Sequence, residues 1–315
     1  MLISPALRPQ EEAAAGPPEG EDVEGLAVQR QLHRHYTSLL AEPEGFAAVP
    51  GWRQRQEVER IERAWVDLLD ARVARHELPD RASQFEPWYF AQAARHTELI
   101  AGLTSHLEGR ATLAEMATFF AFEEKVDSKF DDLMALAQLG TSGRVKLAIG
   151  ENYWDEMGEG DPRLVHTTLF DASVTWMRGQ LGARGADRDR AELPEVYANA
   201  NQLLMYGLNR RYAPRLLGAL GVLEQTASRR FRAMVDGCVR LGVPADVIAY
   251  QRLHVGVDHD HGAEWFEHVL APLVRRSGEL LGEICRGVLT RCEVAVRYYE
   301  TALSQLLGAG RAGSP

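Results

Sequence analysis

The sequence is poor in cysteine, and its cysteines are not paired in a motif. Cys238, Cys285 and Cys292 show no CxxC spacing, which excludes a disulfide framework and a thiolate zinc site. Cys285 and Cys292 lie seven apart on one predicted helix face, and we interpret both as small buried hydrophobic residues. No run approaches about 18 apolar residues, so no transmembrane helix is expected. The N-terminus lacks an apolar signal-peptide core, which predicts a cytoplasmic protein.

Excess basic charge and strand-like patterns are also lacking. The 35 Lys and Arg residues are outnumbered by 45 Asp and Glu residues, and the net charge of -10 argues against a nucleic-acid-binding surface. Alternation of apolar and polar residues is scarce, whereas helical periodicity recurs nearly throughout. With 315 residues, the chain is long enough to bury a sizeable core. These features predict an all-α fold.

The composition divides the chain into one helical domain and two tails. Residues 1–23 are rich in Pro, Gly, Glu and Ala and are predicted to be disordered. Residues 309–315 are expected to fray, and residues 24–308 to form a single domain. Its helices are expected at about 24–41, 52–76, 85–108, 111–138, 142–157, 166–180, 193–206, 208–241 (with a kink near Pro214), 244–268 and 272–307.

One predicted helix carries a set of candidate metal ligands. His254, Asp258 and His261 stand at positions i, i+4 and i+7, which places the three side chains within about 60° on one helix face. Two imidazoles and a carboxylate suit iron or manganese, since no thiolate is present. The alternative interpretation is a solvated, histidine-rich face.

Two glutamates interrupt apolar helix stripes. Glu123 follows Phe119 and Phe122, and Glu224 lies between Leu220 and Ala227. A carboxylate on an apolar face is costly unless it is paired or bound to a cation. Both are therefore candidate ligands. Glu123 is preferred to Glu124, whose helix face is more acidic and better solvated.

Glu156 and His166 flank an interrupted helix. Residues ten apart in an ideal helix are about 80° out of register, but the segment Gly158–Pro162 breaks the helix and could supply the missing rotation. The alternative is an ordinary loop with a surface glutamate. Many ionisable groups in one bundle core would be untenable without cations, and two metal ions would satisfy them. The inward-facing candidates are Glu123, Glu156, His166, Glu224, His254, Asp258 and His261.

The order of these residues resembles a known family. The segment 152–160 (NYWDEMGEG), His166, Glu224 and the His-x3-Asp-x2-His run followed by Trp265 are similar to the haem-oxygenase-like diiron oxidases and oxygenases, often called iron-containing redox enzymes. The resemblance covers roughly residues 110–275. It implies a haem-oxygenase-like multi-helix bundle that holds two Fe²⁺ ions. The six ligands that it implies are Glu156, His166, Glu224, His254, Asp258 and His261, and Glu123 would match a seventh carboxylate present in some members.

The resemblance also implies a reaction class. Such enzymes activate O2 as a co-substrate and need an external electron donor. For this chain it favours N-oxygenation of a small amine or amino-acid-like substrate in a biosynthetic pathway, and it permits a homodimer. Oxidative C–C cleavage or desaturation of an amino or fatty acid stays open, as does a non-catalytic metal-binding protein.

Two further features of the sequence bear on this interpretation. A haem enzyme on the same fold would use a histidine near the N-terminus, such as His33 or His35, but the inward carboxylates argue against haem. Arg210, Arg211 and Arg215 form a basic group that could hold a substrate carboxylate. A solvated helix face is the favoured interpretation of that group.

Overall fold

The computed structural model describes residues 22–181 and 192–311, without the side chains of residues 46–48, 256–260 and 309–311. Every regular element in these ranges is helical, so the predicted all-α fold is confirmed. The predicted tails lie mostly outside the described residues, and the domain limits stay a prediction. The helices are α1 (Leu26–Leu39), α2 (Trp52–Val73), α3 (Ala82–Leu99), α4 (Ala101–Gly109), α5 (Leu113–Asp127), α6 (Phe130–Gln138), α7 (Gly143–Glu156), α8 (His166–Leu181), α9 (Pro194–Leu208), α10 (Ala213–Arg240), α11 (Ala249–Trp265), α12 (Ala271–Val274) and α13 (Gly278–Arg311).

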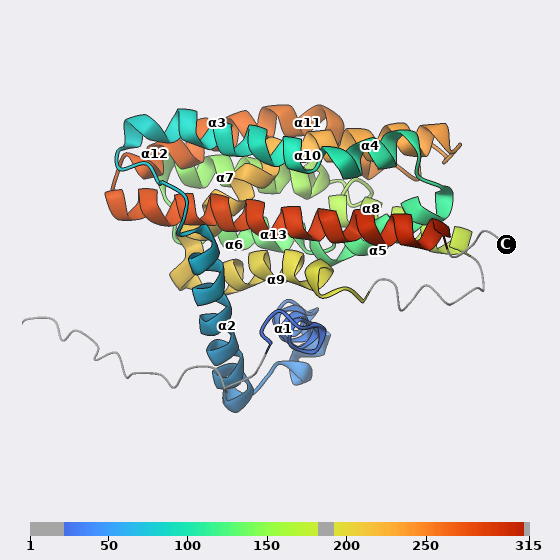
Figure 1. Cartoon of the computed structure of the whole chain (residues 1–315). Coiled ribbons are helices and arrows are strands. Elements are labelled where there is room, and N and C mark those ends of the chain that lie inside the picture. Colours follow the sequence, from blue (N-terminus) through green and yellow to red (C-terminus); the bar gives the residue numbers. More distant parts are fainter. Residues whose placement is uncertain (1–21, 182–191, 312–315) are drawn as a thin grey trace, which may run out of the picture.

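The helices from α3 to α13 form one elongated bundle. Most of them run along its long axis, whereas α2 projects from it at a steep angle and α1 is seen end-on below α9 (Figure 1). Short 3₁₀ turns lie at Pro43–Ala48, Gly158–Gly160 and Arg210–Tyr212, and a π-helical turn at Phe266–Leu270 follows α11. None of the helices within residues 22–181 and 192–311 combines the length and hydropathy needed to cross a bilayer.

Several predicted helices are shorter than the periodicity indicated. The third breaks at Ile100 and the fourth at Ser128–Lys129, where no Gly or Pro marks the break. Pro214 does not kink a long helix; it stands in the first turn of α10, a position where the missing N–H costs nothing. The last helix begins at Gly278 rather than at Pro272, which belongs to α12.

Close packing around α10 sets the positions of its neighbours. An added Cβ at Gly218 would collide with the carbonyl of Ile284 in α13, and one at Gly262 of α11 would meet the backbone of Gln225 at 2.8 Å. Small residues at these crossings therefore let the helix backbones approach closely. Trp265 Nε1 donates a hydrogen bond to the Leu217 carbonyl at 3.1 Å, which fixes the end of α11 against α10.

Cysteine burial agrees with the sequence analysis. Cys238 and Cys285 are buried and Cys292 is half-buried, and all three are free thiols. Burial raises the pKa of each thiol to about 12, so none is ionised near neutral pH. The interpretation as a small buried hydrophobic residue is confirmed for Cys285, whereas Cys292 is only partly buried.

Candidate metal centre

The α7–α8 connection brings Glu156 and His166 together. Gly158, Glu159 and Gly160 have φ values of 62°, 52° and 88°, so the chain turns through a left-handed segment directly after α7. A Cβ on Gly158 would lie 2.5 Å from the backbone carbon of Leu164, which shows how tightly the chain doubles back. As a result, His166 Nδ1 lies 2.9 Å from Glu156 Oε2. The prediction that the interruption supplies the missing rotation is confirmed.

His254 of α11 faces the same glutamate. Its Nε2 lies 3.9 Å from Glu156 Oε1, and its ring centroid lies 4.7 Å from that of His166. Its Nδ1–H donates to the Tyr250 carbonyl at 2.9 Å, which leaves the Nε2 lone pair turned toward Glu156. A backbone acceptor of this kind commonly orients a metal-binding imidazole.

These three buried side chains fit a metal ion. One ligand atom from each of Glu156, His166 and His254 lies within 4.8 Å of the other two. Metal–ligand bonds of about 2.1 Å separate two ligand atoms by about 3 Å at right angles and by about 4.2 Å in line. The observed spacings of 2.9 and 3.9 Å between the ligand atoms fall within this range. Two imidazoles and a carboxylate are donors typical of non-haem iron.

A second group of ligand-type side chains adjoins the first. Glu224 of α10 is buried, and its Oε2 lies 3.8 Å from His261 Nδ1. The other ring nitrogen of His261, Nε2, lies 3.0 Å from Asp155 Oδ2. Asp155 directly precedes Glu156 at the end of α7, so the two groups share that helix end. Four helices thus converge on one polar region of the core.

The protonation of the histidines follows from their surroundings. Burial, together with the charge of His166, lowers the pKa of His254 well below its ordinary value, so this imidazole is neutral and able to donate a lone pair. For His166, burial disfavours the charged form, but the hydrogen bond and charge of Glu156 outweigh it and raise the pKa. In the metal-free protein, the Glu156 carboxylate therefore favours the protonated form of His166.

Two predicted ligands, Asp258 and Glu123, are not found in either group among the described side chains. Asp258 lies in α11, but its side chain is outside those that the structure describes, so its role stays a prediction. Glu123 is described and lies elsewhere: it forms an ion pair with Arg230 and accepts a hydrogen bond from Tyr298 Oη at 2.5 Å. Its burial is therefore explained by protein partners, without a metal ion.

The basic group near the start of α10 also has protein partners. Arg215 is buried, and its guanidinium is held by Asp70 at 2.7 Å and by Glu283 at 2.6 Å. Arg210 donates to the carbonyls of Leu136 and Leu139. Arg215 is therefore part of the core, and the solvated-face interpretation is wrong for it.

Sequence reasoning missed Asp155 as a member of the site. Its position beside Glu156 in the segment 152–160 was the available signal, but a single carboxylate next to a stronger candidate is usually surface charge. The aromatic surroundings of His254 were also missed. Phe231, Tyr250 and His166 all have ring centroids within 5 Å of the His254 ring, which makes its environment apolar.

Comparison with known families bears on this arrangement. A model of the family described as iron-containing redox enzymes matches residues 117–296, more than half of the chain. The chain belongs to that family. Its fold is the haem-oxygenase-like helical bundle, and the family assignment supports an iron-dependent oxidoreductase. The matched region contains α7, α8, α10 and α11, which carry all the clustered residues. No curated protein matches the chain.

Proposed function

We propose that this iron-dependent oxidoreductase is a diiron enzyme that activates O2 and oxidises a small amine or amino-acid-like substrate, with N-oxygenation as the reaction. The observation that carries the proposal is that further ligand-type side chains adjoin one group of converging ligand atoms. Ligand atoms of Glu156, His166 and His254 lie within 4.8 Å of one another. The neighbouring Glu224 faces Nδ1 of His261, and Asp155 faces the other nitrogen of that ring. A single metal ion needs only one such group, whereas paired sites in helical bundles draw carboxylates and histidines from several helices.

The residues would hold the two ions in different surroundings. Glu156, His166 and His254 are at most 7% exposed, and the rings of Phe231 and Tyr250 exclude water from His254. Asp155 is 37% exposed and reaches from solvent to His261. Iron supplies the electron-transfer chemistry toward O2 when it is bound. Asp155 offers a carboxylate at the solvent edge, where Oδ2 can accept a proton from His261 Nε2.

Iron stoichiometry tests the two-ion proposal. Anaerobic titration of the full chain with Fe²⁺ should reach two ions per chain, and rapid mixing with O2 should give a transient visible absorption band. Both results should be lost in Glu224→Ala and in His261→Ala. Arg286→Gln is a matched control, since Arg286 is a half-exposed residue paired only with Glu283. Saturation at one ion, or full loading of both variants, would refute the proposal.

Isotope labelling separates the possible reactions. Labelled O2, offered with a panel of amines and amino acids, should transfer one labelled oxygen atom to nitrogen in N-oxygenation. Desaturation leaves no label in the organic product, and C–C cleavage gives a shortened one. Iron binding without O2 consumption would instead indicate a non-catalytic metal-binding protein. The external electron donor and the homodimer stay predictions that this experiment does not address.

A further inference from the structure

A polar cavity lies in the bundle, apart from the metal-ligand groups. It is enclosed by α3, α5, α9, α10 and α13 and has a volume of about 20 Å³, which is room for a water molecule or a small ion. Its α10 wall is formed by Leu223, Thr226, Ala227 and Arg230, whereas Glu224 points toward α11. Glu123, which is paired with Arg230, also lines the cavity, whereas none of the groups clustered around Glu156 does.

One of its two arginines has carboxylate partners. Arg230 is paired with Glu123, and its Nη1 lies 3.7 Å from Asp127 Oδ2. Tyr298 Oη donates to Glu123 as well. The positive charge of Arg230 is therefore matched within the protein.

The other arginine has only neutral partners. Arg291 is 4% exposed, and its two Nη groups donate to the carbonyl and side-chain oxygens of Asn199, both at 2.7 Å, and to Gln202 Oε1 at 3.3 Å. It forms no ion pair with any described residue. Burial, with the charge of Arg230 contributing, lowers its pKa to about 10, so it remains charged at neutral pH. A buried charge without a counter-ion is strongly unfavourable.

Hydrogen-bonding groups line the same cavity. Arg291 and Asn199 both line the cavity, and the hydrogen bonds described above use the Nη groups of Arg291 and the oxygens of Asn199. His96 is 6% exposed, and its buried Nδ1 has no hydrogen-bond partner. Burial, with smaller contributions from the charges of Arg291 and Arg230, lowers the pKa of His96 to about 4, so its imidazole is neutral near neutral pH. The charge of Arg291 and the unpaired ring nitrogen of His96 together suit an anion.

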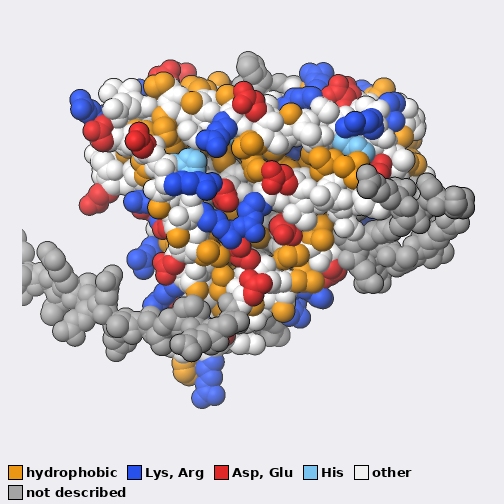
Figure 2. Space-filling model, viewed as in Figure 1, with side chains coloured by type: hydrophobic (Ala, Val, Ile, Leu, Met, Phe, Trp, Pro, Cys, Tyr) orange, Lys and Arg blue, Asp and Glu red, His pale blue; other side chains and the backbone are white. Residues whose placement is uncertain are grey.

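We propose that this cavity binds a small monoanion through Arg291, Asn199 and His96, either the carboxylate group of a small molecule or a free halide. A surface groove between α3 and α13 adjoins the cavity, and His96 and Cys292 line both. Arg75 and Arg95 line that groove together with one acid, Glu293. Figure 2 shows Lys and Arg side chains gathered over α13 on the face where α2 joins the bundle.

The cavity lies close to the metal-ligand groups. The Arg230 guanidinium lies 4.2 Å from the centroid of the Phe231 ring, and that ring lies 4.6 Å from the ring of His254. One aromatic ring therefore separates the two regions. A substrate carboxylate bound here would agree with an amino-acid-like substrate, and that link alone rests on the proposed function. Monoanion binding does not depend on iron.

Calorimetric titration of the metal-free full chain tests the proposal. The protein is titrated with sodium acetate and, in a separate arm, with sodium chloride, in a buffer without either ion. One saturable site per chain is expected, and Arg291→Gln should weaken it at least tenfold. Arg286→Gln removes a half-exposed arginine from the same helix and should leave binding unchanged. Ala295→Val narrows the cavity without touching a polar group and should also weaken binding.

The two arms distinguish the sources of the anion. Tighter binding of acetate supports a carboxylate ligand, and tighter binding of chloride supports a free halide. The absence of saturable binding in the wild-type chain overturns the proposal, as does equal affinity in Arg291→Gln or, if that variant does not fold, in Ala295→Val. Because iron is absent throughout, a failure here is distinct from a failure of the diiron proposal.

Discussion

Two clusters of buried charged side chains lie in this bundle, and their charges are balanced in different ways. In one, Glu156 contacts His166 and His254, and no Lys or Arg forms an ion pair with it in the described ranges. In the other, Glu123 and Asp127 face Arg230. The first cluster contains acids and imidazoles that suit an added cation, whereas the second carries its own. Burial of a carboxylate therefore does not by itself indicate a metal site. The two clusters differ in whether an arginine already pairs with the buried carboxylate.

The largest expected effect is on the stabilisation of the fold by bound iron. A substitution in the Glu156 cluster should reduce it, and a substitution in the Glu123 cluster should not. With free Fe²⁺ at a hundred times its dissociation constant, each bound ion should raise the free energy of unfolding of the wild type by about 2.7 kcal/mol. Glu156→Ala removes a carboxylate that reaches both His166 and His254, so this gain should disappear. Glu123→Gln should retain the full gain. Chemical denaturation under anaerobic conditions, with and without Fe²⁺, measures both variants.

The proposed difference between the two clusters would be wrong if Glu123→Gln also abolished the increase in unfolding free energy on Fe²⁺ binding. In that case Glu123 would be the seventh ligand suggested by the family resemblance, and its pairing with Arg230 would be a feature of the metal-free protein alone. A gain that survives in Glu156→Ala would instead remove Glu156 from the ligand set.

The second effect concerns the stability of the metal-free protein. Here the substitution of Glu123 should be more destabilising than the substitution of Glu156. Glu123→Gln leaves the buried Arg230 with one carboxylate instead of two, which should lower the free energy of unfolding by about 3 kcal/mol. Glu156→Gln removes an acid from a cluster without an arginine, so a change of about 1 kcal/mol or less is expected. Denaturation in the presence of a chelator measures both. Equal losses would show that the two clusters do not differ in the way proposed.

Much of the metal centre could be predicted because its signals are local in the sequence. The spacing of His254 and His261 indicates one helix face, and the glycines after Glu156 indicate where the chain turns back to His166. Both inferences use only helix geometry and backbone preferences. The all-α fold follows from the same periodicity. The structure confirms that Glu156, His166 and His254 meet, as this reasoning requires.

The difference between Glu123 and Glu224 could not be predicted in this way. Each stands alone on an apolar helix stripe, and the decisive partner of Glu123, Arg230, lies more than a hundred positions away on another helix. Only tertiary packing brings that guanidinium to the carboxylate. The breaks at Ile100 and Lys129 were missed for a similar reason, since no Gly or Pro marks them and the apolar pattern continues across each one.

A smaller effect is expected at the solvent edge of the metal centre. Asp155→Asn removes the charge that faces His261 Nε2 at 3.0 Å while preserving the shape of the side chain. Loss of a carboxylate that orients a histidine typically weakens metal affinity about 10-fold or more. Anaerobic Fe²⁺ titration should therefore show one weakened ion and one unchanged ion. Asp161→Asn is the control, because Asp161 pairs with Arg163 in the nearby loop and contacts no ligand. Equal weakening of both ions would place Asp155 at a position shared by the two groups.

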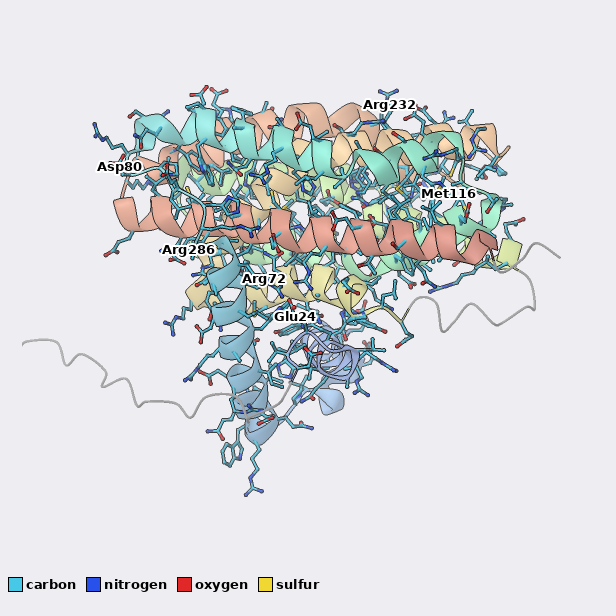
Figure 3. The ribbon with its side chains drawn as sticks, in the orientation of Figure 1. Glu24, Arg72, Asp80, Met116, Arg232 and Arg286 are labelled. Carbon is cyan, nitrogen blue, oxygen red and sulfur yellow. The ribbon has the colours of Figure 1, made fainter. Side chains whose placement is uncertain are left out.

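The smallest effect comes from a carboxylate that is paired with arginines but only partly buried. Glu24 faces Arg72 across the contact with α2, with an O–N distance of 2.5 Å (Figure 3), and Arg297 lies at 3.4 Å. Partial burial raises the pKa of Glu24, but the hydrogen bond from Arg72 and the charge of Arg297 outweigh it and lower the pKa below 4.5. Its contribution to stability is therefore present above the ordinary pKa and is lost as the pH falls through the folded-state value.

Glu24→Gln should accordingly cost only about 0.5 kcal/mol at neutral pH, because solvent screens the pair. The difference in the free energy of unfolding between this variant and the wild type should vanish in acid. Denaturation curves recorded across the acid range measure it, with the exposed Glu59→Gln as the control. A loss as large as that of Glu123→Gln would contradict the argument that burial, rather than the presence of an arginine, sets the strength of these pairs. Carboxylate–guanidinium pairs would then contribute equally to the free energy of unfolding at the surface and in the core.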